Sequence, residues 1–241
     1  MRLEDVARAR RDGGLAVLEG FHALKHAVRF GAELLGVWTA DPEALEALRL
    51  RMAPDIAFAA DTVDEAALAA VVPRAQVVAV ARRPRVAHPD VLIASAGLEP
   101  LVLLEDPRHL GNLGAAIRVA AAAGAGGLLT TGRQDPWHPD ALRGSAGLHF
   151  ALPVYRLAEL PTGPRPLLAL DPEGERLDPR AVPPGAILAF GTERDGLTDA
   201  LLARADARLA LPMTAGVSSL NLATAVSATL FALALLPPAG G

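Results

Sequence analysis

Short runs of apolar residues alternate with longer mixed stretches through the second half of the chain. Each run is four or five residues long and rich in Leu, Val, Ile or Ala, which is typical of strands buried on both faces. Such runs occupy residues 101–104, 127–130, 167–170, 187–190 and 207–211. The stretches between and after them predict helices at 112–123, 139–146, 198–203 and 217–236. This alternation predicts a parallel sheet with helices on both faces.

The first 83 residues repeat the α/β pattern on a smaller scale. Strands are predicted at 15–18, 34–39, 56–59 and 76–81, and helices at 3–12, 20–30, 42–51 and from 61 onward. Pro42 suits the first position of a helix, and Asp61, Thr62 and Asp64 are residue types that cap helix starts. We therefore predict a small α/β domain over residues 1–83.

The composition changes between these two regions. Arg82, Arg83 and Arg85 open a stretch that contains Pro89 and ends at Pro100. Proline and charge at this density are typical of a connecting segment. We interpret residues 84–98 as a linker with some basic charge, followed by the larger α/β domain at 99–241.

The end of the chain resembles a membrane span in composition. No charged residue occurs from Leu209 to Gly241, and 223–236 is largely apolar. A spanning helix needs about 20 consecutive apolar residues, whereas Ser and Thr interrupt this run. We expect a buried helix that forms an interface rather than a membrane helix.

Composition and net charge bear on the cellular compartment of the protein and on its partners. The 241 residues contain no cysteine, which excludes disulfides and thiolate metal sites and fits a reducing cytoplasm. The first residues do not open the apolar core of a signal peptide. The net charge of −4 is unusual for a protein that binds nucleic acid. Residues 1–36 carry six Lys and Arg, which form either a local basic face or an ordinary solvated surface.

Three segments place polar residues where an apolar strand ends and a helix begins. The first signature segment is 111–118 (GNLGAAIR), the second is 191–197 (GTERDGL), and the third is 211–221, with LPM at its start and VSSLN at its end. Ligands of open α/β sheets bind at the carboxyl ends of strands. The three segments therefore predict one composite site.

Arg118 and Asn112 are the chemically informative residues of the first signature segment. Asn112 stands where the helix is predicted to begin, and Arg118 follows about one and two-thirds turns later, on a different face. An Arg in the first turns of a helix opposes the helix dipole, and a guanidinium matches the geometry of a phosphate. A surface or ion-paired Arg is the alternative interpretation.

The other two segments also allow structural and functional interpretations. Glu193 either caps a helix or is a carboxylate that orients Arg118 or the backbone. Helix capping explains one of Ser218, Ser219 and Asn221. The remaining two need partners if the helix is buried, and a ligand is one kind of partner.

Other site chemistries are disfavoured. The glycines do not have the spacing of a dinucleotide-binding fingerprint or of a phosphate-binding P-loop. No Ser, His and Asp combination has the local spacing of a hydrolase. His109, His138 and His149 are scattered, so we predict no metal site.

Taken in order, the three signature segments resemble the motifs of the SpoU (TrmH-type) RNA ribose 2′-O-methyltransferases, a branch of the SPOUT class. The resemblance covers residues 99–236, and 135–139, 143–147 and 152–154 also look like the region between the family's motifs. Residues 1–83 resemble the α/β substrate-binding domain of many members, mainly in length and in Leu18-Glu19-Gly20.

The resemblance implies a fold and a cofactor. The second and third signature segments would form a deep trefoil knot, a rare exception to the usual rules of chain connection. The knot would hold S-adenosylmethionine through backbone groups of Gly191, Leu211 and Leu220, with Met213 nearby. The family acts as a homodimer, and the uncharged last helix suits its interface.

The resemblance also implies a reaction, in which a ribose 2′-hydroxyl attacks the methyl group of the cofactor. Arg118 matches the essential Arg of the family. Because its pKa makes Arg a poor base, we expect Arg118 to hold an RNA phosphate and stabilise the developing oxyanion; a direct role as base is the alternative. Asn112, Ser219 and Asn221 would position the ribose and Arg118, and Glu193 would be structural or orienting. No metal is needed.

The sequence therefore predicts a methyltransferase acting on RNA, on ribosomal RNA in preference to transfer RNA. The choice of RNA rests on the extra N-terminal domain alone. The RNA would be engaged by residues 1–36, by Arg82, Arg83 and Arg85, and across the dimer. Two alternatives come from other classes: a non-catalytic member that binds RNA or cofactor, and an unrelated α/β enzyme that uses a nucleotide.

Overall fold

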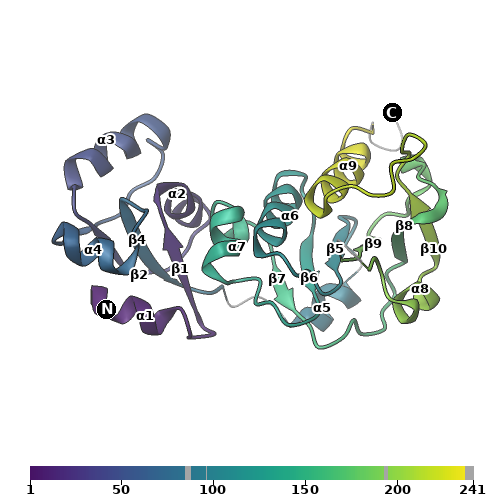
Figure 1. Ribbon diagram of the computed structural model, residues 1–241, viewed down its shortest axis with the longest axis horizontal. Helices are drawn as coiled ribbons and strands as arrows, with labels where there is room; N and C mark the ends of the chain where they lie inside the picture. Colours follow the sequence, from purple (N-terminus) through teal and green to yellow (C-terminus); the bar gives the residue numbers. More distant parts are fainter. Residues whose placement is uncertain (85–87, 96, 193–194, 237–241) are drawn as a thin grey trace. The chain divides into compact units, whose positions relative to one another are not determined.

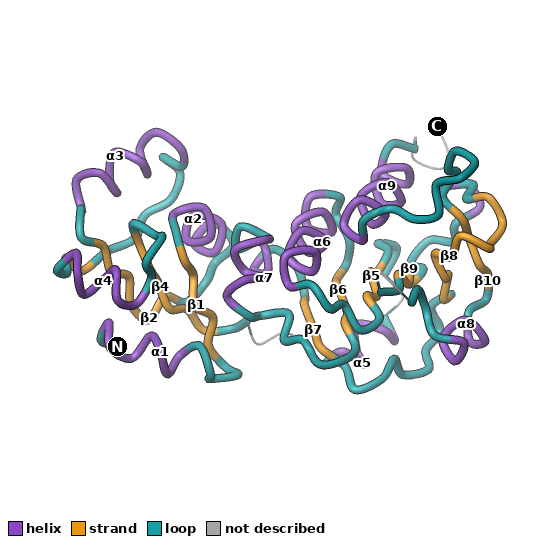
Figure 2. Tube along the Cα trace, viewed as in Figure 1, coloured by secondary structure: helices purple, strands orange, loops and turns teal. Residues whose placement is uncertain are grey.

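The structure is a computed structural model, and it describes residues 1–84, 88–95, 97–192 and 195–236. The chain forms two compact units, one comprising Met1–Arg85 with Trp137–Ala151 and the other Val86–Pro136 with Leu152–Gly241. The segment 137–151, which the sequence analysis assigns to the larger domain, thus clusters with the N-terminal residues. Each unit has its own sheet (Figures 1 and 2).

The sheet of the first unit is mixed. Its strand order is β1-β4-β2-β3, with β4 antiparallel to both β1 and β2, and β3 parallel to β2. The strands are β1 (Leu15–Glu19), β2 (Leu34–Thr39), β3 (Asp61–Thr62) and β4 (Val77–Arg82). The helices are η1 (Leu3–Asp5), α1 (Val6–Ala9), α2 (Phe21–Arg29), α3 (Pro42–Met52), α4 (Glu65–Val71), α7 (Pro139–Gly144) and η2 (Leu148–Phe150).

Apolar side chains hold α1 and α4 against this sheet. Val6 of α1 and Leu68 of α4 join Val17, Trp38 and Val80 in one buried cluster. Helix α4 begins where it does because the Asp64 carboxylate accepts hydrogen bonds from the backbone N–H groups of the next turn.

The sheet of the second unit is parallel throughout. Its order is β10-β8-β9-β5-β6-β7. The strands are β5 (Leu101–Leu104), β6 (Gly127–Thr130), β7 (Val154–Arg156), β8 (Leu167–Arg176), β9 (Ile187–Phe190) and β10 (Ala207–Ala210). The helices are α5 (Pro89–Ala94), α6 (Leu110–Ala122), η3 (Pro179–Ala181), α8 (Asp199–Arg204) and α9 (Leu222–Ala234). The predicted parallel α/β fold is confirmed.

Helices cover both faces of this parallel sheet. Leu101 and Leu103 of β5 pack against Ile93 of α5 and Leu201 of α8 on one face. Successive side chains of a strand point to opposite faces, so Val102 and Leu104 point to the other, where α6 and α9 pack side by side (Figure 1). All four residues of β5 are fully buried, which explains the unbroken apolar run.

Some predicted elements are wrong. Residues 56–59 form no strand, and the short β3 at 61–62 takes that place beside β2. The linker contains α5, which His88 caps. Strand β7 was missed because only three residues pair at the sheet edge.

The last helix begins later than predicted, at Leu222 rather than at residue 217. Among the described residues, no helix combines the length and the apolar character that crossing a bilayer requires.

Candidate active site

The carboxyl ends of three neighbouring strands lie at one edge of the parallel sheet. Leu104 of β5 is in register with Thr130 of β6 and with Phe190 of β9. The loops that follow these strands therefore leave the sheet together, which is where α/β proteins bind ligands. Two of the signature segments start from this edge, because α6 follows β5 and residues 191–197 follow β9.

The loop after β9 closes tightly on itself. Thr192 and Gly196 exchange two backbone hydrogen bonds of 3.0 and 3.2 Å. A Cβ atom on Gly191 would lie 2.0 Å from the carbonyl carbon of Gly196, so only glycine fits there. The second signature segment thus owes its shape to a close approach of two backbone stretches.

Glu105 ties this loop to the end of β5. Its carboxylate accepts hydrogen bonds from the backbone N–H and the hydroxyl of Thr198, at 2.7 and 2.8 Å. Its own N–H donates to the carbonyl of Phe190. Nearby, Arg108 forms an ion pair of 2.8 Å with Asp195. The sequence analysis missed both ties, although a carboxylate directly after a buried strand is a signal for such a role.

Asn221 joins the third signature segment to the first. Its side-chain oxygen caps α9 by accepting from the N–H groups of Ala223 and Thr224. Its side-chain nitrogen donates to Oδ1 of Asn112 at 3.0 Å. The structure therefore brings Asn112 and Asn221 together although 109 positions separate them.

The structure corrects the local setting of Asn112 and Arg118. Helix α6 begins at Leu110 with His109 as its N-cap, so Asn112 lies in the first turn and not at the cap. Arg118 lies past the middle of this 13-residue helix. Its charge therefore does not oppose the helix dipole, since the effect of the dipole fades beyond the first turn.

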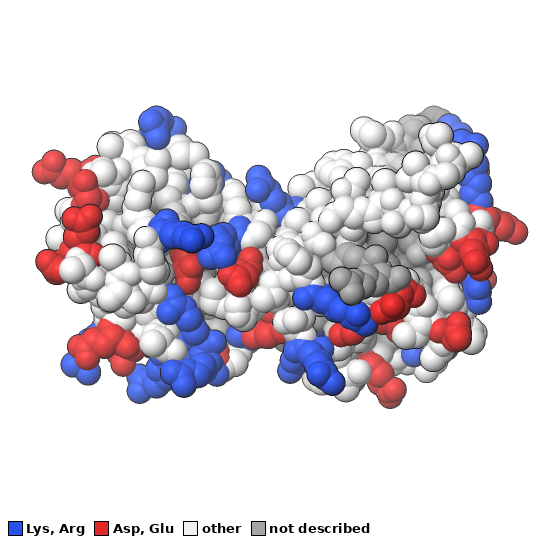
Figure 3. Space-filling model, in the orientation of Figure 1, with Lys and Arg blue, Asp and Glu red and all other residues white. Residues whose placement is uncertain are grey.

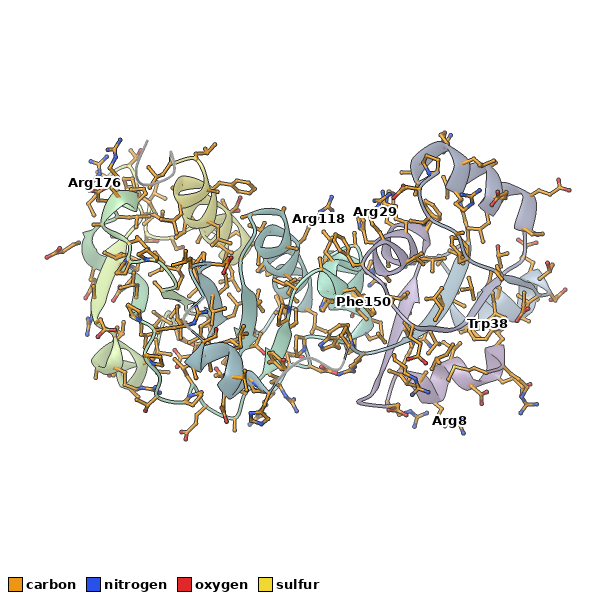
Figure 4. The ribbon with its side chains drawn as sticks, turned by 180° about the vertical axis from the view of Figure 1, so that it is seen from behind. Arg8, Arg29, Trp38, Arg118, Phe150 and Arg176 are labelled. Atoms are coloured by element: carbon orange, nitrogen blue, oxygen red, sulfur yellow. The ribbon has the colours of Figure 1, made fainter. Side chains whose placement is uncertain are left out.

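Arg118 is exposed and points outward from α6 (Figure 4). Its guanidinium forms no hydrogen bond or ion pair with the residues that the structure describes. Of the alternative interpretation, a surface or ion-paired Arg, the structure agrees with the surface position. Glu193, the carboxylate predicted to act beside Arg118, lies outside the described residues.

Ser218 and Ser219 also differ from expectation. Because α9 starts at Leu222, both serines lie in the preceding loop and are exposed. The buried hydroxyl of this region belongs to Thr229 instead, and it donates to the carbonyl of Ala225 one turn earlier. The polar residues of the third signature segment are therefore not forced to find partners inside a buried helix.

A cavity of about 460 Å³ lies beside the loop of residues 191–197. All four residues predicted to hold a cofactor line it: Gly191, Leu211, Met213 and Leu220. Ser218 and Ser219 line it too, whereas Asn112 and Arg118 do not. Its volume is in the range of small-molecule sites.

The cavity combines apolar side chains with backbone groups and carboxylates. Leu170, Phe190, Leu209 and Leu211 supply apolar surface, and Asp171, Glu173 and Asp195 supply charge. The sequence analysis did not single out these three carboxylates. Within the described ranges, no group of His, Asp and Glu side chains is arranged to hold a metal ion.

Most basic residues proposed to contact RNA are paired with acids of their own unit. Arg8 pairs with Asp5, Arg10 with Glu19, Arg29 with Asp55 and Arg82 with Glu33. Arg83 donates to the carbonyl of Leu15 and lies over the ring of Trp137. Lys25 and Arg11 form no ion pair with any described residue, and Arg85 lies outside the described residues.

These features define an α/β protein with a cofactor-sized cavity at the carboxyl edge of a parallel sheet. A sequence model of the SpoU rRNA Methylase family matches residues 99–231, more than half of the chain. The chain belongs to this family, and the resemblance carried by the three signature segments is confirmed.

Individual relatives agree with this assignment. An uncharacterised tRNA/rRNA methyltransferase of Mycobacterium bovis is 36% identical over 165 residues, which are 63% of this chain and 56% of that protein. A 23S rRNA uridine 2′-O-methyltransferase of Streptomyces viridochromogenes is 34% identical over 145 residues, which are 54% of this chain and 50% of that protein. The matches thus span about half the length of these curated relatives.

A solved structure shows the same fold. The SpoU methyltransferase AviRb from Streptomyces viridochromogenes, crystallised in complex with AdoMet, superposes with a TM-score of 0.77 at 24% sequence identity. The superposition covers 96% of this chain and 95% of that one. The chain therefore has the fold of a SpoU methyltransferase.

Proposed function

We propose that this protein is an RNA ribose 2′-O-methyltransferase that uses S-adenosylmethionine. The family assignment and the relative that methylates a uridine 2′-oxygen of 23S rRNA support this proposal. The observation that carries it is the cavity, which the second and third signature segments line together. We further propose that these two segments form the trefoil knot that the family resemblance implies.

The cavity suits the cofactor in size and chemistry. Leu209, Leu211 and Leu220 offer an apolar surface for an adenine ring, and the backbone at Gly191, Thr192 and Gly196 offers polar groups for its edge. When bound, S-adenosylmethionine supplies an electrophilic methyl group, so no metal is required. The chain has to bind the cofactor, position the RNA and stabilise charge on the ribose oxygen.

We assign Arg118 to the RNA phosphate and to the developing oxyanion. An exposed guanidinium can bind a phosphate without first breaking an ion pair. A guanidinium is a poor base, so the phosphate would relay the proton; a direct base role for Arg118 is the alternative. Asn112, Ser219 and Asn221 position the ribose and Arg118, and Glu193 is structural or orients them.

Ribosomal RNA is the proposed substrate, with transfer RNA as the alternative. The first unit carries 13 Lys and Arg against 13 Asp and Glu, whereas the second carries 10 against 14. The first unit is therefore the better RNA-binding surface, and we keep residues 1–83, which make up most of it, as the proposed RNA-binding domain, with 84–98 as the linker. On α2, Lys25 forms no ion pair with a described residue and can contact a phosphate, whereas Arg29 would first have to leave Asp55.

We also propose a homodimer through α9. Phe231 and Leu235 are 39% and 83% exposed, and they extend the helix face that includes Ala228. No charged residue occurs from Leu209 onward, and Figure 3 shows a broad uncharged area over this part of the second unit. An apolar surface of this kind is typical of a protein–protein interface. A chain without cysteine suits the reducing cytoplasm, where we place the activity.

The test is transfer of labelled methyl from S-adenosylmethionine to unmodified ribosomal and transfer RNA. We expect label in ribosomal RNA, reduced by about 100-fold or more in Arg118→Ala, because an interaction made in the transition state is lost. Arg180→Ala is the matched control, since Arg180 is an exposed arginine of the same unit. Cofactor binding without transfer to either RNA would favour the non-catalytic alternative, and no cofactor binding would contradict the proposal.

A further inference from the structure

The cavity of the second unit is acidic. Asp171, Glu173 and Asp195 line it, and no Lys or Arg is among its described lining residues. Carboxylates in a concave site with low-dielectric walls concentrate a negative potential there. The cavity is therefore complementary to a cation, a property that the function as proposed so far does not use.

An irregularity in β8 places two of these carboxylates in the wall. Residue 169 pairs with Arg208 of β10, and the next pair joins Glu175 to Leu209, so residues 170–174 have no partner on β10. Four consecutive residues of this five-residue bulge, 170–173, line the cavity, and Asp171 and Glu173 are among them. A Cβ atom on Gly174 would lie 2.5 Å from the carbonyl carbon of Arg208, so glycine is needed where the bulge closes.

Neighbouring arginines neutralise these carboxylates unequally. Asp195 is paired with Arg108 at 2.8 Å, whereas Asp171 and Arg208 are 3.8 Å apart. Glu173 forms no ion pair with any residue that the structure describes. Acidic and basic side chains lie close together on the β8 and β10 side of this unit (Figure 3). Among the described lining residues, the negative charge that no close arginine offsets is thus centred on the bulge of β8.

We propose that Asp171 and Glu173 make the cavity select the cationic cofactor over its neutral product. This inference rests on the proposed function. In the reaction the bond between sulfur and the methyl carbon would break, a bond between that carbon and the ribose oxygen would form, and the hydroxyl proton would pass to the RNA phosphate. The sulfur keeps the electron pair, so a positively charged sulfonium becomes an uncharged thioether. The acidic wall then favours entry of S-adenosylmethionine and release of S-adenosylhomocysteine.

Isothermal titration calorimetry with the full chain tests this inference without requiring RNA or turnover. Each protein is titrated with S-adenosylmethionine and with S-adenosylhomocysteine at low ionic strength. The variants are Glu173→Gln and Asp171→Asn, and the latter keeps the oxygen that accepts from the N–H of Glu173. Glu175→Gln is the matched control, because Glu175 is an exposed carboxylate of the same strand that does not line the cavity.

We expect each cavity variant to bind S-adenosylmethionine about fivefold more weakly than the wild type does. The affinity for S-adenosylhomocysteine should change by less than about twofold. The wild-type preference should also shrink as salt is added, because exposed charges are screened. Equal weakening of both ligands, or unchanged binding of S-adenosylmethionine, would overturn the charge selection alone. Failure of the wild type to bind either ligand would overturn the proposed function itself, and the inference with it.

Discussion

At the scale of single residues, the contact between Asn112 and Asn221 links two distant signature segments. Asn221 serves two partners at once, because its oxygen caps α9 while its nitrogen donates to Asn112. One residue therefore fixes both the start of a helix and the position of a second polar side chain. A substitution that keeps the helix cap but removes the hydrogen bond to Asn112 separates the two roles.

Asn221→Asp should keep the cap of α9 and remove the hydrogen bond to Asn112. A carboxylate still accepts from the N–H groups of Ala223 and Thr224, so we expect a stability within about 0.5 kcal/mol of the wild type. It cannot donate to Asn112, so methyl transfer should fall by about tenfold or more. Thermal unfolding measures the stability, and initial rates measure methyl transfer. Asn221→Ala is the companion variant and should lose about 1 kcal/mol of stability as well.

An Asn221→Asp variant that transfers methyl at the wild-type rate would show that the hydrogen bond to Asn112 has no part in positioning the substrate. A large loss of stability in the same variant would instead show that the carboxylate disturbs α9, and the rate would then say nothing about Asn112.

At the scale of elements, the shape of the loop after β9 decides the shape of the cavity. Its backbone pairing between Thr192 and Gly196 depends on the close approach at Gly191. Glu105 holds the far side of the same loop through Thr198. The cavity wall is thus a backbone structure fixed from two directions.

Gly191→Ala should disrupt this loop. Its new Cβ would lie 2.0 Å from backbone atoms, which cannot yield as a flexible side chain can. We expect a stability loss of about 1–3 kcal/mol and cofactor binding at least about tenfold weaker. Calorimetric binding and thermal unfolding measure both. Gly13→Ala is the control, since nothing lies within 4 Å of its added Cβ. Unchanged cofactor affinity would contradict the role of this loop.

Apolar pattern predicted the elements well where burial is complete. Strands β5, β6 and β9 were predicted with the observed bounds, because each is buried on both faces. The errors fall where tertiary contacts decide. Helix α9 starts at Leu222 because the side chain of Asn221 caps it, although the apolar stretch around it allowed an earlier start. The bulge of β8 depends on contacts with β10 that no local pattern records.

The site was predictable in part, because local patterns identify its segments but not the contacts between them. The sequence singled out residues of three loops, and the structure places Gly191, Leu211, Met213 and Leu220 around one cavity. It did not predict that Asn112 and Asn221 contact each other, or that Asp171 and Glu173 line the cavity. These pairings depend on strand order and register, which a single sequence does not specify.

At the scale of the whole molecule, the uncharged surface of α9 has the character of a protein–protein interface. Val226 and Leu230 are buried against the second unit, whereas Phe231 and Leu235 remain exposed. Exposed large apolar side chains near one another are costly for a monomer in water. A second copy of the chain would cover them.

The double variant Phe231→Glu with Leu235→Glu should therefore be a monomer. Two carboxylates at the centre of an apolar interface would be desolvated without partners, at a cost of several kcal/mol. Sedimentation equilibrium of wild type and variant measures the state directly. Val91→Glu is the control, because Val91 is an apolar residue on α5 whose exposure of 58% lies between those of Phe231 and Leu235. A wild type that is monomeric at micromolar concentration would contradict the proposed dimer.

The most direct test of the central claim is the identity of the methylated nucleoside. RNA treated with the protein and labelled S-adenosylmethionine is digested to nucleosides and separated by mass. The account predicts that the label appears in a nucleoside methylated on the ribose 2′-oxygen, and that Arg118→Ala abolishes it. Label on a base, or label of the same amount in Arg118→Ala, would contradict the proposed reaction.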